Sequence, residues 1–314
     1  MESRWLSIDG PVHYAEWDGP NDGPTFVLVH GLGGAHVNWL SVAPGLARHG
    51  RVLALDLAGF GRTPLGGRRA TIGSNRRLLH RFISSTGSSP AIVVGNSMGG
   101  AISAAEAADE PESVAGLVLV DPALPRSLNT AADPVVAALF ATYLVPGVGE
   151  RFMKARAHAL GPERLVLDTM RICCVDASRV DPAVIEASIA LARERAEMPW
   201  TNKAFLEAAR SLLRRLARRE KFLAMMHRIS CPTLMIHGAK DRLVPLGAAR
   251  AIAEMRTDWT FQVLDDIGHV PMLEDPGLWL AAVEVWLEGA GRAARSISAA
   301  DRTRDLRSAT EVSS

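Results

Sequence analysis

A single serine stands among glycines in the stretch VVGNSMGGA, residues 93–101. The residues before it form an apolar, β-like run and those after it an alanine-rich, helix-like one, so Ser97 lies at a sharp turn from strand to helix. Small neighbours are needed where the two backbones crowd together, and Gly95 and Gly99 meet that need. The pattern predicts that Ser97 is a nucleophile. Its alternative interpretation is a helix-capping serine on a glycine-rich turn.

Two loops downstream carry the partners that such a serine needs. A serine hydroxyl is a weak nucleophile and requires a base, which in turn requires an acid to hold its tautomer. Asp241 follows the apolar run PTLMIHG, and His269 follows the run VLDDIG, giving the chain order Ser, Asp, His. We predict His269 as the base and Asp241 as the acid. Asp121, which closes an earlier apolar run, is the alternative acid.

Other ionisable residues near these loops fit the chemistry less well. His237 precedes the predicted acid, which is the wrong order for the base. Asp265, Asp266 and Glu274 are close to His269 in sequence. We expect these three carboxylates to form a solvated rim.

A second glycine-rich loop, HGLGG at residues 30–34, also follows an apolar run. Acyl transfer needs N–H donors aimed at the negative oxygen of the tetrahedral intermediate. Gly31 has no Cβ, so the backbone there can approach a substrate closely. We predict that the backbone amides of Leu32 and Met98 form this oxyanion hole; a purely structural turn is the alternative.

The elements that must position these residues follow from the hydrophobic pattern. Short apolar runs alternate with longer helix-compatible segments, which predicts a mostly parallel sheet flanked by helices. The predicted strands are Val12–Trp17, Thr25–Val29, Val52–Leu55, Ala91–Val94, Val114–Val120, Thr233–Ile236 and Thr260–Leu264. The predicted helices between them are Thr71–Ser84, Met98–Ala108, Leu246–Met255 and Leu278–Leu287.

One long interval, from Asp121 to Pro232, contains no convincing strand. A structureless loop of that length is implausible in a compact domain, so we predict an inserted helical subdomain. Its helix-like pieces are Val135–Leu144, Val184–Glu194 and Phe205–Met226. The predicted division is a core at 1–122 and 232–289, a cap at 123–231, and a mobile C-terminal tail at 290–314.

Composition narrows the class of protein. The 314 residues carry a formal net charge of +1, which gives no reason to expect nucleic acid as a partner. The cysteines Cys173, Cys174 and Cys231 show no metal-binding spacing, so we expect neither disulfides nor a metal. The N-terminus lacks a secretory signal, and no apolar stretch is long enough for a membrane span. We therefore expect a cytoplasmic protein, and the excess of arginine over lysine suggests a bacterial origin.

Taken together, the motifs resemble those of α/β-hydrolase fold serine hydrolases, from about Thr25 to Asp121 and again from Pro232 to Trp286. The matching motifs are HGLGG, DLAGFGRT, GNSMGG, GAKDRLVP and GHVPMLEDP. The resemblance implies an eight-stranded, mostly parallel sheet, a helical cap inserted after the sixth strand, and an acyl-enzyme mechanism without cofactor or metal. In that family DLAGFGRT, residues 56–63 here, is usually a structural loop near the pocket.

The favoured function is hydrolysis of an ester with a small or medium, largely apolar acyl group. GNSMGG is also similar to the elbow of hydrolases that cleave carbon–carbon bonds in ring-fission products. Those enzymes usually carry Ser-Gly-Pro in the oxyanion loop and tryptophan after the catalytic histidine, whereas this chain has Leu32-Gly33-Gly34 and Val270. A cofactor-free perhydrolase or haloperoxidase would use the same triad. A non-catalytic binding protein would usually lack one triad member.

Two features of the inserted segment leave alternatives open. Apolar side chains there could line a substrate pocket or simply form the cap's own core; they are Val136, Leu139, Phe140, Tyr143, Met170, Met198, Met225 and Met226. A basic stretch interleaved with leucines could rest on an anionic membrane surface or form a solvated face. Its cationic residues are Arg214, Arg215, Arg218, Arg219 and Lys221.

Overall fold

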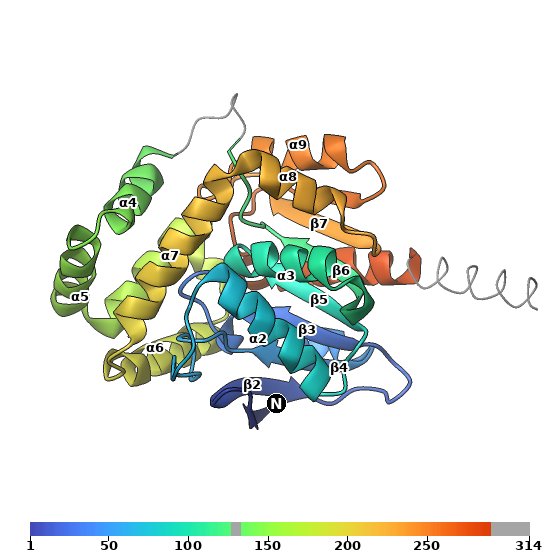
Figure 1. Cartoon of the computed structure of the whole chain (residues 1–314), viewed down its shortest axis with the longest axis horizontal. Helices are drawn as coiled ribbons and strands as arrows, with labels where there is room; N and C mark the ends of the chain where they lie inside the picture. The colour runs from blue at the N-terminus through green and yellow to red at the C-terminus, as the bar shows by residue number, and fades with distance from the viewer. Residues whose placement is uncertain (127–132, 290–314) are drawn as a thin grey trace, which may run out of the picture.

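An eight-stranded sheet forms the centre of the computed structural model, which describes residues 1–126 and 133–289 (Figure 1). The strands, in order across the sheet, are β1 (Glu2–Ser7), β2 (Pro11–Trp17), β4 (Arg51–Leu55), β3 (Thr25–Val29), β5 (Ala91–Asn96), β6 (Val114–Val120), β7 (Thr233–Gly238) and β8 (Thr260–Leu264). β2 runs antiparallel to both β1 and β4, and all other neighbours are parallel. The predicted mostly parallel sheet is confirmed.

All seven strands identified from the sequence are present, but the first strand, β1, was not predicted. Its residues ESRWLS are almost all exposed, and the segment lacks the apolar run that marks the buried strands. It forms the edge of the sheet by pairing with β2, from Glu2 opposite Glu16 to Ser7 opposite Pro11. The position of β1 is therefore determined by its pairing with β2 and not by burial of its own side chains.

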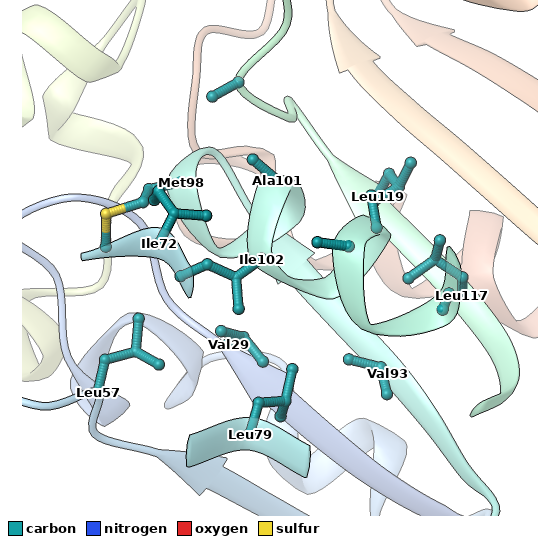
Figure 2. Close-up of a cluster of buried hydrophobic side chains, with 14 of the residues drawn as sticks. Val29, Leu57, Ile72, Leu79, Val93, Met98, Ala101, Ile102, Leu117 and Leu119 are labelled. Carbon is teal, nitrogen blue, oxygen red and sulfur yellow. The ribbon is translucent and has the colours of Figure 1, made fainter. Parts of the chain in front are cut away.

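Helices cover both faces of the sheet. One face holds α2 (Ile72–Ser85), α3 (Met98–Asp109) and α9 (Leu246–Met255), whose buried side chains join those of alternate strand residues in one core cluster. Figure 2 shows part of this cluster, with Ile102 of α3 and Leu79 of α2 close to Val29 and Val93. The opposite face packs against α1 (Ala43–Leu46) and the helix at residues 276–289. Burial on both faces explains the continuously apolar strands.

Among the described residues between β6 and β7 there are five α-helices, and we refer to this inserted set as the cap. They are α4 (Pro134–Leu144), α5 (Val148–Cys173), α6 (Pro182–Ala196), α7 (Thr201–Ala217) and α8 (Arg219–His227). In Figure 1, α4, α5 and α6 lie beside the sheet, and α7 runs from them to α8, which contacts α3. The described part of this interval, residues 121–126 and 133–232, contains no strand, as predicted.

The helices of the cap differ from the prediction in two places. α5 was not predicted, because Gly161, at φ 69, and Pro162 interrupt its helical pattern. The predicted helix Phe205–Met226 is two helices, α7 and α8, separated at Arg218, whose ψ of 58 is not helical. The predicted tail at 290–314 lies outside the described residues.

No single described helix is both long and apolar enough to cross a membrane. The pair α4 and α5 passes that test together by length and composition, but a bend of 117° separates the two helices.

Candidate active site

Ser97 occupies the turn between β5, which ends at Asn96, and α3, which begins at Met98. Its backbone has φ 52 and ψ −117, a conformation that costs a non-glycine residue about 1–3 kcal/mol. The Ser97 amide donates to the carbonyl of Val120 (3.0 Å), and its own carbonyl accepts from the amide of Ala123 (2.9 Å). Bonds on both sides of the residue thus hold Ser97 in the strained turn at the carboxyl end of β5.

Crowding of the backbone around this turn explains its glycines. A Cβ on Gly99 would lie 2.1 Å from the carbonyl oxygen of Val29, and a Cβ on Gly95 would lie 2.6 Å from the carbonyl oxygen of Gly99. A Cβ on Gly31 would approach the Cβ of Ser97 to 3.1 Å. The HGLGG loop and the serine turn are therefore in direct contact.

His269 and Asp241 form a buried hydrogen-bonded pair. The Nδ1 atom of His269 lies 2.7 Å from Oδ2 of Asp241, and both side chains are almost fully buried. The other carboxylate oxygen, Oδ1, accepts from the amides of Leu243 (2.8 Å) and Val244 (3.0 Å). An ionised Asp241 can only accept, so Nδ1 carries the proton and Nε2 is left with a free lone pair. This is the tautomer that a general base needs.

A second buried carboxyl, Asp121, lies beside this pair. The polar atoms of Asp121, His237 and Asp241 lie within 4.8 Å of one another. Asp121 Oδ1 accepts from the amide of Gly238 (2.8 Å), whereas Oδ2 has no donor among the described residues. Two adjacent buried carboxylates cannot both ionise at low cost, so their hydrogen bonds decide which one carries the charge.

The charge resides on Asp241. Burial raises the pKa of Asp121 well above its usual range, and the negative charge of Asp241 raises it further. Burial also opposes ionisation of Asp241, but the adjacent imidazole of His269 and its hydrogen bond hold the pKa of that carboxyl below its usual value. The direction of the two shifts therefore favours a neutral Asp121 beside an ionised Asp241.

His237 is held in a structural position. It is fully buried, and its Nε2 lies 2.8 Å from the carbonyl oxygen of Val244. Burial lowers the pKa of His237, so the ring is neutral and donates through Nε2. Its Nδ1 faces Asp121 Oδ1 at 3.7 Å. This arrangement supports the loop that carries Asp241.

The HGLGG loop is fixed by its first residue. His30 donates through Nδ1 to the carbonyl of Gly31 (2.8 Å), and its Nε2 accepts from the amide of Leu57 (3.1 Å). Neither the amide of Leu32 nor that of Met98 donates to any residue that the structure describes. Both predicted oxyanion-hole donors are therefore available to a ligand.

The DLAGFGRT loop is organised by the buried carboxylate of Asp56. It accepts from Nδ1 of His13 (2.7 Å) and, at His36, from Nδ1 (3.0 Å) and the backbone amide (2.7 Å). The side chains of His13, His36 and Asp56 could present ligands to a metal ion, but the Nδ1 atom of each histidine already bonds to the carboxylate of Asp56. Arg195 of α6 donates to the carbonyl of Gly61 (2.8 Å), so the loop also anchors the cap.

Sequence reasoning missed a direct connection between the cap and the His269 loop. The amide of His269 donates to the carbonyl of Cys173 at the end of α5 (2.6 Å). Glu274 accepts from the amide of Gly268 (2.8 Å) through one oxygen and from that of Asp176 (2.8 Å) through the other. The connection depends on where α5 ends, which no sequence motif indicated.

Glu274 is consequently 2% exposed, so its predicted place in a solvated rim is wrong. Its two carboxylate oxygens are instead occupied by backbone amides of the cap and of the loop. Asp265 and Asp266 are exposed, as predicted.

Aromatic side chains of the cap reach the HGLGG loop. A Cβ on Gly33 would lie 3.2 Å from the ring of Phe205 on α7. The Phe205 ring packs edge-on against Tyr143 at 5.2 Å, and Tyr143 contacts Phe140 at 5.9 Å and Phe152 at 6.1 Å. Three of the methionines for which both a pocket and a core position were open are buried in the core clusters, namely Met170, Met225 and Met226.

Comparison with known proteins places this chain among hydrolases. It is 29% identical over 259 residues to 2-hydroxy-6-oxo-6-(2'-aminophenyl)hexa-2,4-dienoic acid hydrolase of Metapseudomonas resinovorans, covering 81% of this chain and 80% of that protein. It is 30% identical over 286 residues to Lipase 3 of a Moraxella species, covering 87% and 80%. The structure of a thermophilic esterase from Thermogutta terrifontis has a TM-score of 0.69 at 24% identity, covering 92% of this chain and 99% of that one.

The model of the alpha/beta hydrolase fold family matches residues 24–276. This match includes every strand from β3 to β8, the inserted helices, and the three residues Ser97, Asp241 and His269. The sheet order and the position of the insertion agree with it. The chain belongs to the alpha/beta hydrolase fold family.

Proposed function

We propose that this protein is a serine esterase in which Ser97, His269 and Asp241 form the catalytic triad. The observation that carries the proposal is the buried bond between Nδ1 of His269 and Oδ2 of Asp241, at 2.7 Å. That bond leaves Nε2 of His269 as the base, on the strand edge where Ser97 is held in a strained turn.

The reaction would proceed in two halves. His269 removes the proton of Ser97 as the hydroxyl attacks the acyl carbon, and the amides of Leu32 and Met98 stabilise the negative oxygen. His269 then protonates the leaving alcohol. A water molecule deprotonated by His269 releases the acid and restores the serine. Asp241 keeps the imidazole oriented and stabilises its positive charge in both halves.

The substrate we propose is an ester with an apolar acyl group of small or medium size. The ring of Phe205 lies against the HGLGG loop, and Tyr143, Phe140 and Phe152 extend that apolar surface through the cap. Aromatic and aliphatic walls with few polar groups are typical of sites for apolar ligands. The similarity to Lipase 3 supports the same chemistry.

Hydrolysis of p-nitrophenyl esters, from acetyl to dodecanoyl, tests this proposal. Wild-type protein should show turnover with an optimum at one chain length, and Ser97→Ala and His269→Ala should each lower kcat by about 10³-fold or more. The double variant should lose little more, because triad members act as a unit. Near-native turnover by Ser97→Ala would overturn the proposal.

Hydrolysis of a carbon–carbon bond is the second candidate function. It is supported by the 29% identity to a hydrolase of an aminophenyl hexadienoic acid. The discriminating measurement is decay of the visible absorbance of a 2-hydroxy-6-oxo-hexa-2,4-dienoate substrate. Ser97-dependent decay without ester turnover would select this function. Perhydrolase or haloperoxidase chemistry by the same triad would be separated from ester hydrolysis only by an assay that supplies peroxide.

A further inference from the structure

A basic cleft lies where the cap meets the core, lined by residues of α2, α3, α7 and α8. Its volume is about 440 Å³. Five cationic side chains line it, together with a single carboxylate, Asp109; the cations are Arg214, Arg215, Arg218, Lys221 and Arg228. None of the three proposed triad residues belongs to its lining. The cleft is therefore separate from the candidate active site.

The carboxylate in the cleft is already paired. Asp109 accepts from Arg228 at 2.6 Å and lies 3.7 Å from the guanidinium of Arg76, outside the lining. Among the residues that the structure describes, no acceptor or carboxylate pairs with the side chains of Arg214, Arg218 or Lys221. Positive charge in the cleft thus exceeds negative charge, although the whole chain has a net charge of only +1.

Arg215 shows the excess most directly. Its Nε is buried and has no hydrogen-bond partner among the described residues, while its Nη2 lies 2.6 Å from the sulfur of Met225. A thioether is a weak acceptor and carries no charge. Burial lowers the pKa of Arg215, and the positive charges of Arg228 and Arg76 lower it further, against the opposing effect of Asp109. An anion in the cleft would offset this unfavourable charge.

The core side of the cleft adds a further donor. Ile72 and Gly73 line it from the first turn of α2, a helix of 14 residues whose positive dipole end is located there. The Ile72 amide is bonded to Ser211 Oγ (3.1 Å), but the Gly73 amide donates to no described residue. A free amide at a helix N-terminus favours an anion, and Gly73 lines the same cleft as the unpaired guanidinium groups of Arg214 and Arg218.

We propose that this cleft binds a phosphate group, carried either by a soluble phosphorylated compound or by a phospholipid headgroup. Guanidinium groups present paired N–H donors that match phosphate oxygens in bidentate geometry, and several of them together suit a group with two negative charges. The bound phosphate would connect the cap helices α7 and α8 to α2 of the core. The proposal is independent of the reaction at Ser97.

Isothermal titration with inorganic pyrophosphate at low ionic strength tests the proposal. The chain offers a matched pair of variants, because Arg218 lines the cleft and its neighbour Arg219 does not. We expect saturable binding that Arg218→Gln weakens about tenfold, while Arg219→Gln leaves the affinity unchanged. Ester hydrolysis should be unaffected in both variants, which shows that they fold. Absence of saturable binding, or equal weakening by both variants, would overturn the proposal.

A second experiment shows whether the phosphate group belongs to a phospholipid or to a soluble compound. Co-sedimentation is measured with vesicles of phosphatidylglycerol and of phosphatidylcholine, with and without pyrophosphate. Binding to the anionic vesicles that pyrophosphate and Arg218→Gln both abolish supports a headgroup ligand. Pyrophosphate binding without vesicle binding supports a soluble ligand. Vesicle binding that neither treatment changes, in a protein that does not bind pyrophosphate, contradicts a phosphate site in the cleft.

Discussion

The side-chain amide of Asn96 donates a hydrogen bond to the backbone carbonyl of His269 at 3.1 Å. The same Nδ2 atom also donates to the carbonyl of Val120, again at 3.1 Å. Asn96 immediately precedes Ser97, and its side chain is buried. One amide group therefore links the serine turn to the loop that carries the proposed base, across 173 positions of sequence.

Replacement of Asn96 should disturb the position of His269, the proposed base, relative to Ser97. Asn96→Ala removes both N–H donors and leaves the buried carbonyl of His269 without this partner, at a cost of about 1–3 kcal/mol, whereas the carbonyl of Val120 still accepts from the Ser97 amide. We expect kcat for an ester to fall by at least about tenfold with little change in KM, since the substrate pocket is not touched. Steady-state kinetics below the unfolding transition checks this. An unchanged kcat would show that Asn96 only stabilises the fold.

Replacement by asparagine should have different effects at the two buried aspartates, Asp241 and Asp121. Asp241→Asn removes the negative charge beside His269 and favours the wrong tautomer, so kcat should fall by about 10³–10⁴-fold. Asp121 is already neutral because burial raises its pKa, and the side-chain oxygen of an asparagine can still accept from the Gly238 amide. Asp121→Asn should therefore lower kcat by less than about tenfold. The reverse order would assign the acid of the triad to Asp121.

Glu274 should tune activity through the loop that it supports. Its two oxygens accept from the amides of Gly268 and Asp176, so it joins the end of α5 to the loop of His269. Glu274→Gln turns one acceptor into a donor that faces an N–H group, and we expect kcat and the melting temperature both to fall. Glu284→Gln, which alters an exposed pair with Arg48, provides the control. Equal effects of the two changes would contradict this role.

Backbone crowding at the serine turn should make Gly99 intolerant of any side chain. A Cβ there would lie 2.1 Å from the carbonyl oxygen of Val29 and 2.6 Å from that of His30. Backbone atoms of a central strand cannot move aside, so Gly99→Ala should lower the free energy of unfolding by about 3 kcal/mol or more. Gly67→Ala, where no atom lies within 4 Å, should have almost no effect. Urea denaturation of both variants checks the contrast.

The sequence predicts the core of this protein better than its cap. The core elements follow from local residue patterns, whereas the position of the cap depends on contacts between residues far apart in the chain. Strands buried on both faces appear as continuous apolar runs, and the turn at Ser97 requires glycines at fixed spacing, so both are readable locally. The bonds from Asn96 to His269 and from Glu274 to Asp176 join residues far apart in the chain. No local pattern encodes such contacts. The strand β1 was missed for a different reason: it pairs with the next strand along the chain, but its few buried side chains form no apolar run that would mark it in the sequence.

The lowered pKa of His30 predicts how the stability of the protein depends on pH. Burial lowers the pKa of His30 from 6.5 to about 4 in the folded state. Above pH 6.5 the ring is neutral whether the chain is folded or unfolded, so the full contribution to stability is present. As the pH falls from 6.5 toward 4, the unfolded chain binds a proton that the folded protein does not, and stability is lost. The loss should reach about 3 kcal/mol for this group.

His30→Gln isolates this contribution from that of the other titrating groups. Glutamine can still accept from the Leu57 amide and donate to the Gly31 carbonyl, but it does not titrate. Urea denaturation at a series of pH values should show the variant less stable than the wild type at neutral pH. The gap should narrow as the pH falls toward 4, because only the wild type loses the contribution of His30. Parallel stability curves would contradict this prediction, because they would mean that the His30 ring binds a proton as readily in the folded protein as in the unfolded chain.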